Sequence, residues 1–297
     1  MKAAAILIGL VAACGPGTRG DNFGDDDGSG SGMGSGSGVA GQCDKMDIVF
    51  VVDDSGSMSE EQSNLASNFP MFAQILSTYV DGDGNPIDFR VGVTTTGRNL
   101  HYAPIGGIPL PDEHGPNGGF EGMPKWLDNA DTMLPHDLSS RAAVGTSGAS
   151  QEMPLLMAKR AVSDRMTDGT QAGFLRSDAL LAVVMITDED DQSNTDDGVD
   201  VPLAGLPINW NPSDEVQFFD TLKGNRTRWA AGVIAGDGMC TSSFGDAVDG
   251  TRLKQFVQMA NSNSTQAVFS SICDADLSIG LKKALDTFQS ACGAIIL

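Results

Sequence analysis

The first segment that could do chemistry is a set of oxygen-bearing side chains directly after an apolar run. The run is Met46 to Val52, and it is followed by Asp53-Asp54-Ser55-Gly56-Ser57. Side chains at alternating positions 53, 55 and 57 can converge on one point, while Gly56 lets the backbone turn tightly. Carboxylate and hydroxyl oxygens are hard donors that suit Mg²⁺, with Mn²⁺ or Ca²⁺ as competitors. The segment therefore predicts a divalent-cation site.

The charge of these donors indicates what such a site would do. Ser55 and Ser57 are neutral hydroxyls, so an ion held mainly by them, with carboxylates acting through bound water, keeps net positive charge. That ion can accept a carboxylate from a partner at an open coordination position. We therefore expect a binding site for a protein that presents an acidic residue.

Apolar runs and amphipathic stretches alternate along the chain from Asp44 onward. This alternation predicts an α/β fold of the Rossmann-like, doubly wound kind, in which helices flank a mostly parallel sheet. Ligands bind such sheets at the carboxyl ends of the strands, where Asp53 lies. The expected strands are Met46–Val52, Phe89–Thr95, Leu180–Thr187, Trp229–Ala235 and a short Ala267–Ser271. One helix is expected to begin near Ser59. Four others are expected at Gln151–Val162, Asp214–Leu222, Thr251–Ala260 and Leu277–Gln289.

The start of the first helix has a capping signal. Ser-Glu-Glu-Gln at Ser59 predicts that this serine caps the helix.

A long segment without a regular pattern follows the second expected strand. Residues from about 97 to 140 have no clear period and are rich in Gly and Pro, so we expect a long surface insertion.

The motif at Asp53 also carries a family resemblance. Asp-x-Ser-x-Ser in a loop between a strand and a helix resembles the metal-ion-dependent adhesion site (MIDAS) of von Willebrand factor type A (VWA) domains. The resemblance covers about Asp44 to the C-terminus, and it implies the VWA fold for residues 43–297. It also implies that a Thr and an Asp from two later loops complete the site.

The resemblance assigns these two ligands to specific positions. Asp188 follows the apolar run Leu180 to Thr187 and matches the aspartate. Thr146, in Gly145-Thr146-Ser147-Gly148 ahead of a helix, matches the threonine. The separation of Thr146 from Asp53 is longer than in typical members, and the insertion would account for the excess. Thr94, Thr95 and Thr96 are its rivals.

Two further acidic clusters have simpler interpretations. Asp81-x-Asp83-x-Asn85 begins like an EF-hand loop, but the sixth position is Pro86 and the twelfth is Gly92, so we expect a plain turn. Glu189-Asp190-Asp191 and Asp196-Asp197 are expected to form a solvated rim beside Asp188; the alternatives are a Ca²⁺ site or a bias of the metal site against acidic partners.

The N-terminus predicts export and lipidation. The apolar run Ala3 to Val11 is too short to span a bilayer and ends in Val11-Ala12-Ala13-Cys14, which resembles a bacterial lipobox. We expect residues 1–13 to be a signal peptide and Cys14 to be lipidated. Residues 14–42 are rich in Gly, Ser and Asp and predict a flexible tether. The expected location is the bacterial cell envelope, and Gly15 favours the outer membrane or the cell surface.

The other four cysteines predict two disulfides in an oxidising compartment. Three pairings are open. We prefer Cys43 with Cys292, because these residues bracket the predicted domain, and Cys240 with Cys273. A zinc site is disfavoured because the sequence has no Cys-x-x-Cys pair and its three histidines are scattered.

Charge and motif content exclude other classes of function. The formal net charge of -21 repels phosphate backbones, so nucleic acid is not expected as a partner. The sequence has no Gly-x-Ser-x-Gly, His-Glu-x-x-His or Walker-type motif, and we do not expect an enzyme. A metal-dependent adhesion module is the preferred function. The alternatives are a structural envelope component in which the metal only stabilises loops and, less favoured, a metal-assisted hydrolase.

Overall fold

The structure, a computed structural model, describes residues 43–81, 83–202, 204–242, 245–274 and 276–293. All described residues belong to one compact unit, Gly38–Leu297. The expected signal peptide, Cys14 and the tether lie outside the described residues. Within the described part, no helix has the length and apolar character needed to cross a membrane.

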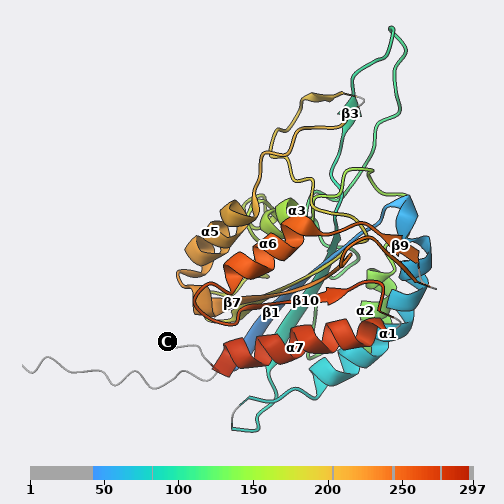
Figure 1. Cartoon of the computed structure of the whole chain (residues 1–297). Helices are drawn as coiled ribbons and strands as arrows, with labels where there is room; N and C mark the ends of the chain where they lie inside the picture. Colours follow the sequence, from blue (N-terminus) through green and yellow to red (C-terminus); the bar gives the residue numbers. More distant parts are fainter. Residues whose placement is uncertain (1–42, 82, 203, 243–244, 275, 294–297) are drawn as a thin grey trace, which may run out of the picture. The chain divides into compact units, whose positions relative to one another are not determined.

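A six-stranded sheet in the order β10-β7-β5-β1-β2-β4 organises the fold (Figure 1). Its strands are β1 (Lys45–Val52), β2 (Asp88–Thr95), β4 (Leu127–Asp128), β5 (Leu180–Ile186), β7 (Trp229–Ala235) and β10 (Ala267–Ser271). Neighbouring strands are parallel except for β2 and β4, which are antiparallel. The predicted doubly wound, mostly parallel α/β sheet is confirmed.

Helices cover both faces of this sheet, because alternate residues of each central strand face opposite cores. Ile48 and Phe50 of β1 pack with residues of α1, α2 and α7, whereas Val49 and Val51 pack with residues of α3, α5 and α6. Figure 1 shows these two helical layers. The helices are α1 (Ser59–Ser77), α2 (Leu134–Ala142), α3 (Pro154–Val162), α4 (Asp164–Thr167), α5 (Pro212–Lys223), α6 (Thr251–Ala260) and α7 (Leu277–Gly293), with 3₁₀ turns at Gly56–Met58 and Arg226–Arg228.

Helix α1 begins at Ser59 as expected, but its N-cap and the start of α3 differ from expectation. The N-cap of α1 is Met58, and the Ser59 hydroxyl donates to Glu60 (2.6 Å), so the predicted cap by Ser59 is wrong. Helix α3 begins at Pro154 instead of near Gln151. The residues before it pair with other loops, because the Met153 N–H donates to the Thr96 carbonyl (3.1 Å) and the Glu152 carbonyl accepts from Gln192 (2.7 Å).

The segment from about 97 to 140 is a surface insertion only in its first half. There, β3 (His101–Tyr102) pairs with β6 (Asp200–Val201), and a projecting hairpin turns at Gly106 and Gly107, which both have positive φ (Figure 1). The second half supplies β4, α2 and buried side chains. The Phe120 ring occupies the space above Gly92, where an added Cβ would lie 2.4 Å from it. The expectation of a surface loop is wrong for this second half.

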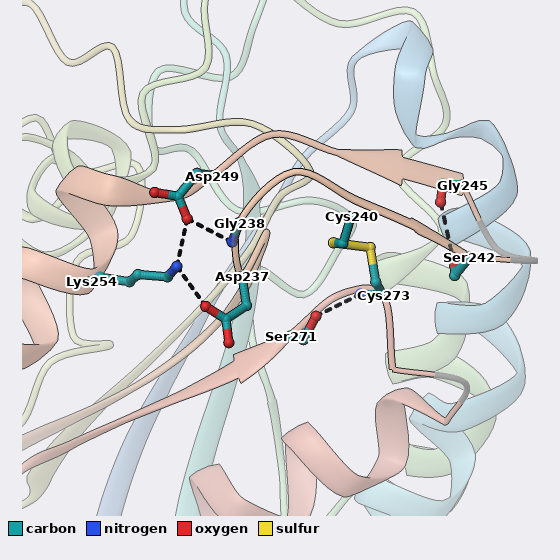
Figure 2. Close-up of a disulfide and its surroundings, with 9 residues drawn as sticks. All are labelled: Asp237, Gly238, Cys240, Ser242, Gly245, Asp249, Lys254, Ser271 and Cys273. Carbon is teal, nitrogen blue, oxygen red and sulfur yellow. Dashed lines mark hydrogen bonds and ion pairs between the residues drawn. A yellow bond between two sulfur atoms is a disulfide. The ribbon is translucent and has the colours of Figure 1, made fainter.

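Two disulfides join distant parts of the chain, Cys43 with Cys292 and Cys240 with Cys273. This is the pairing preferred from the sequence. The first joins the start of β1 to the end of α7. The second joins the small antiparallel hairpin of β8 (Cys240–Ser242) and β9 (Gly245–Ala247) to the turn after β10 (Figure 2). Both disulfides are typical of proteins in an oxidising compartment.

Candidate metal centre

Asp53 is held at the end of β1 by the neighbouring strand β5. Val52 lies opposite Ile186, so the residues that follow the two strands meet at one edge of the sheet. The Asp53 N–H donates to the Ile186 carbonyl (2.9 Å), and the Thr187 hydroxyl donates to Asp53 Oδ2 (2.6 Å). The Ser55 N–H donates to Asp53 Oδ1 (2.8 Å). The Asp53 carboxylate is therefore buried and fixed in orientation by the protein alone.

Ser55, Ser57 and Asp188 lie beside this carboxylate. The Oγ atoms of Ser55 and Ser57 are 2.9 Å apart, and the Ser57 hydroxyl interacts with the Asp188 carboxylate. Ser55 and Asp188 are buried, whereas Ser57 is exposed. The structure thus brings four of the five predicted metal ligands together, with one hydroxyl facing solvent.

Thr146 lies on the loop that packs against the motif, but its hydroxyl has no hydrogen bond to the predicted ligands within the described residues. The Gly148 N–H donates to the Asp54 carbonyl (2.7 Å), and the Thr146 carbonyl lies 4.0 Å from the position of a Cβ on Gly56. Its half-buried side chain is next to the motif without a fixed role.

The rival threonines at the end of β2 contact acidic groups of the site. The Thr95 hydroxyl interacts with the Asp54 carboxylate, and the Thr96 hydroxyl donates to Glu152. Thr94 is buried, and its Oγ1 has no partner in the described part of the chain. Thr95 and Thr96 therefore position carboxylates, while the ligand role of Thr146 stays a prediction.

Two carboxylates that sequence reasoning missed complete the cluster. One oxygen each of Asp53, Asp54 and Glu152 lie within 4.8 Å of one another, and all three residues are buried. Asp54 is part of the motif, but it was not among the predicted ligands, which occupy the alternating positions 53, 55 and 57. Glu152 is the single charged residue between Ser150 and Lys159, six positions after Thr146. A single acidic residue in an otherwise uncharged stretch is the sequence feature that could have indicated a functional role for Glu152.

Burial and mutual repulsion raise the pKa values of these carboxyl groups. Burial is the main cause for each. It raises the pKa of Asp53, and it raises the pKa of Asp54 to about 6 and of Asp188 to about 7, with a smaller contribution from the negative charge of Asp53. Burial and the Asp53 charge raise the pKa of Glu152 to about 10. Among the described residues, the groups that chiefly shift these four pKa values include no Lys, Arg or His.

The donor set fits a divalent cation. Asp54 Oδ1, Glu152 Oε1 and Asp188 Oδ1 are buried and have no hydrogen-bond partner among the described residues. An unpaired buried polar atom is costly, and a buried charge is normally paired or bound to a metal. Carboxylate and hydroxyl oxygens are the ligands that Mg²⁺, Mn²⁺ and Ca²⁺ prefer. A cation at this place would satisfy these atoms and oppose the rise in pKa.

These raised pKa values predict how the stability of the metal-free protein depends on pH. A carboxyl group whose pKa is higher in the folded state stabilises the fold below its unfolded pKa, and this stability is lost as pH rises through the folded pKa. With Asp54 at about 6 and Asp188 at about 7, the free energy of unfolding should fall between pH 4 and pH 8. We expect a loss on the order of 5 kcal/mol, measured by urea unfolding in EDTA.

Magnesium should reverse this loss, most strongly above pH 7, because metals bind the deprotonated carboxylates. Groups with lowered pKa, such as Asp249 at about 2, act in a separate window below pH 4. A metal-free stability that stays flat or rises from pH 5 to pH 8 would contradict the assignment of a buried acidic cluster.

Gly148 lies so close to Asp54 that it offers a test with every predicted ligand retained. A Cβ at Gly148 would lie 2.2 Å from the Asp54 carboxylate. We expect Gly148→Ala to displace Asp54 and to weaken Mg²⁺ binding about 10- to 100-fold, measured by calorimetry. Gly293→Ala, where nothing lies within 4 Å, is the control and should bind Mg²⁺ as the wild type does. If Gly148→Ala and Gly293→Ala bind Mg²⁺ with equal affinity, Asp54 is not part of the metal site.

The acidic run after Asp188 is structural and not a solvated rim. The Asp190 carboxylate accepts from the Arg252 N–H (3.0 Å) at the start of α6. The Asp191 side chain is fully buried, accepts from the Leu155 N–H (3.1 Å) at the start of α3, and pairs with Arg252 (3.3 Å). The expectation of a solvated rim is wrong for these two residues, which fix the Asp188 loop to both helices.

The remaining acidic groups behave more simply. Asp197 is exposed and pairs with Arg160 (2.7 Å). Asp81 Oδ1 accepts from the N–H groups of Asp83 (2.9 Å) and Asn85 (2.8 Å), which is a plain turn as expected.

Comparisons with known proteins give distant similarities. No protein-family model matches the sequence, and no curated protein matches it. Proximal thread matrix protein 1 from the mussel byssus is 15% identical, with 84% of this chain and 49% of that chain covered and a TM-score of 0.44. The pilus adhesin SpaC from Lactobacillus rhamnosus GG is 12% identical, with coverages of 84% and 30% and a TM-score of 0.40. The manganese-loaded TRAP protein of Plasmodium vivax is 12% identical, with coverages of 80% and 73% and a TM-score of 0.36.

Another structure of the mussel protein is described as having a zinc-occupied MIDAS motif. This chain spans about half the length of the mussel protein and less than a third of SpaC.

Proposed function

We propose that this protein is a metal-ion-dependent binding module that engages a partner protein through an acidic side chain. The observation that carries the proposal is the cluster of buried, unpartnered carboxylate oxygens around two neighbouring serine hydroxyls at the carboxyl edge of the sheet. Its position at the ends of β1 and β5 is where open α/β sheets bind ligands. We assign Asp53, Ser55, Ser57, Thr146 and Asp188 as the residues that hold Mg²⁺, or Mn²⁺ or Ca²⁺ in its place.

The ion, when bound, supplies positive charge and a coordination position for the partner's carboxylate. The residues of this chain set how much of that charge remains. Ser55 and Ser57 contribute neutral oxygens, and Thr187 and the Ser55 N–H already share the charge of Asp53. In this proposal, Asp54 and Glu152 lie outside the direct ligands and act through water. The exposed side of Ser57 is where the partner approaches.

Water exchange at the site tests this function. With Mn²⁺ bound, an open coordination position holds a water that exchanges with solvent and enhances its proton relaxation. We expect this enhancement in the full chain and a decrease when an acetylated, amidated aspartate is added, with the asparagine analogue as control. Relaxation that does not exceed the value for a fully enclosed Mn²⁺ ion would overturn the proposal.

The second candidate is a purely structural metal site, in which the ion only locks the loops of this domain. The burial of Asp53, Asp54 and Ser55 favours it, because most of the donor set is closed to solvent. An enclosed ion without exchangeable water is the result that this alternative predicts.

We further propose that the binding module belongs to a lipoprotein of the bacterial cell envelope, at the outer membrane or the cell surface. Cys14 would carry the lipid, and residues 14–42 would connect it to the folded part. We expect Cys14→Ser to move the protein from the membrane fraction to the soluble fraction, because a lipid anchor supplies the membrane affinity. Fractionation that does not change would argue against lipidation.

A further inference from the structure

The hairpin that projects from the domain after β2 ends in an apolar tip (Figure 1). Between Ala103 and Pro111 no side chain is charged or can form a hydrogen bond. Ile105 is 46% exposed and Ile108 is 70% exposed. A Cβ added at Gly106 or Gly107 would meet no atom within 4 Å, so the tip stands clear of the rest of the described domain. Exposed apolar surface of this kind marks a contact with a membrane or with another protein.

The backbone of the tip offers few hydrogen-bond donors to a partner. The Ile105 N–H donates to the Ile108 carbonyl (3.0 Å), and the Ile108 N–H donates to the Ile105 carbonyl (2.9 Å). Pro104, Pro109 and Pro111 have no N–H. These prolines oppose the addition of a strand from another sheet. The same features lower the cost of placing this backbone in hydrocarbon, where an unpaired polar group is expensive.

Charged side chains begin again at the base of the tip. His101 Nδ1 lies 2.6 Å from an oxygen of Asp112, and His101 Nε2 lies 3.9 Å from an oxygen of Asp200. The strand from His101 to the turn at Gly106 is at most about 17 Å long, and interfacial elements enter a bilayer by about 5–10 Å. The apolar tip can therefore enter the interface while the charged base stays in water.

A bilayer fits this tip better than a pocket on another protein does. Protein interfaces surround an apolar centre with polar groups, and residues 103–111 offer no polar side chain for such a rim. The hydrocarbon of a bilayer requires none.

The proposed lipid anchor can bring the tip to a bilayer. The chain enters the domain at the start of β1, whereas the hairpin leaves the sheet at the end of β2, which is parallel to β1. These two points are about 27 Å apart along the strands, and the hairpin adds at most about 35 Å. Residues 14–42 can span up to about 100 Å. The chain length is therefore enough for Cys14 and the tip to reach the same membrane.

We propose that the tip of this hairpin inserts into the interface of a lipid bilayer and forms a second membrane contact beside the lipid anchor. The choice of a bilayer rests in part on the lipoprotein assignment proposed above. The tip is small, so it binds weakly by itself, and attachment through Cys14 raises its effective concentration at the membrane. The net charge of -21 opposes approach to an anionic surface, so the lipid that suits the tip is zwitterionic.

Vesicle binding tests this contact without the anchor. The full chain with Cys14→Ser is incubated in EDTA with millimolar phosphatidylcholine vesicles, and the bound fraction is measured by flotation. We expect binding that increases with lipid concentration and decreases as phosphatidylglycerol replaces phosphatidylcholine. EDTA prevents the metal centre from binding a headgroup phosphate through a metal ion.

Two double variants of this Cys14→Ser chain locate the contact. Ile105→Ser/Ile108→Ser removes the most exposed large side chains of the tip and should weaken vesicle binding about 10-fold or more. Ile208→Ser/Ile279→Ser is the matched control, because these isoleucines are 44% and 48% exposed elsewhere on the domain. It should bind vesicles as the Cys14→Ser chain does.

Three outcomes would overturn the proposal. The absence of binding to phosphatidylcholine vesicles would leave another protein as the occupant of the tip. Equal binding by the two double variants would place the membrane contact outside the tip. Binding that requires phosphatidylglycerol would show attachment by charge and not by insertion. All of these experiments lack the lipid anchor, so the lipoprotein assignment stands or fails separately, by the fractionation of Cys14→Ser described above.

Discussion

Asp53→Asn is expected to abolish the stabilisation of this protein by Mg²⁺ and to weaken Mg²⁺ binding by at least about 100-fold. Asparagine keeps the size of the side chain and an oxygen that can accept from the Ser55 N–H, so the loop should retain its conformation. The variant also removes one charge from a repulsive buried cluster. Its melting temperature in EDTA should therefore equal or exceed that of the wild type. Thermal unfolding with and without Mg²⁺ measures both effects.

Asp81→Asn is the matched control for this experiment. It removes one carboxylate from the acidic turn that precedes β2, away from the carboxyl ends of the strands. It should leave the Mg²⁺-induced rise in melting temperature unchanged. A rise that persists in Asp53→Asn and disappears in Asp81→Asn would move the metal site to the turn and overturn the assignment.

Loss of the disulfide between Cys43 and Cys292 is expected to have the largest effect on stability. This bond closes a loop with a sequence separation of 249, against 33 for Cys240 and Cys273. Constraint of the unfolded chain increases with loop length, and the double variant Cys43→Ser/Cys292→Ser should lose about 3–5 kcal/mol of unfolding free energy. Urea unfolding at neutral pH measures this loss.

The second disulfide provides the comparison. The difference in loop length makes Cys240→Ser/Cys273→Ser about 2 kcal/mol less destabilising in the chain-entropy model. Its effect should fall mainly on the β8–β9 hairpin, which this disulfide joins to the turn after β10. If Cys240→Ser/Cys273→Ser lost as much unfolding free energy as Cys43→Ser/Cys292→Ser, or more, constraint of the unfolded chain would not be the source of the stabilisation.

The central part of the fold could be predicted because its signals are strong and local. Strands buried on both faces appear as continuous apolar runs, and β7 and β10 begin and end at the predicted residues. The elements that were missed depend on tertiary contacts. Strand β4 has two residues, and the core around it depends on Phe120 filling the space above Gly92, which no local pattern reveals.

The candidate site could be predicted where it is carried by a contiguous motif. Asp53, Ser55 and Ser57 follow from spacing, and the register of β1 with β5 explains why Asp188 joins them. Glu152 could not be placed, because the loop before α3 that brings it to Asp53 is held by backbone hydrogen bonds with Thr96 and Gln192. Asp190 and Asp191 look solvated in sequence because their partners are helix N-termini that are distant along the chain.

The most direct test of the central claim is the anomalous diffraction of crystals grown with Mn²⁺. We expect a single peak beside Asp53, Ser55, Ser57 and Asp188, with a water or a carboxylate from outside the domain in its coordination sphere. A peak enclosed by Asp53, Asp54 and Glu152 alone would support a structural metal. An ordered ion elsewhere, or no ordered ion at this edge of the sheet, would contradict the metal-dependent binding function.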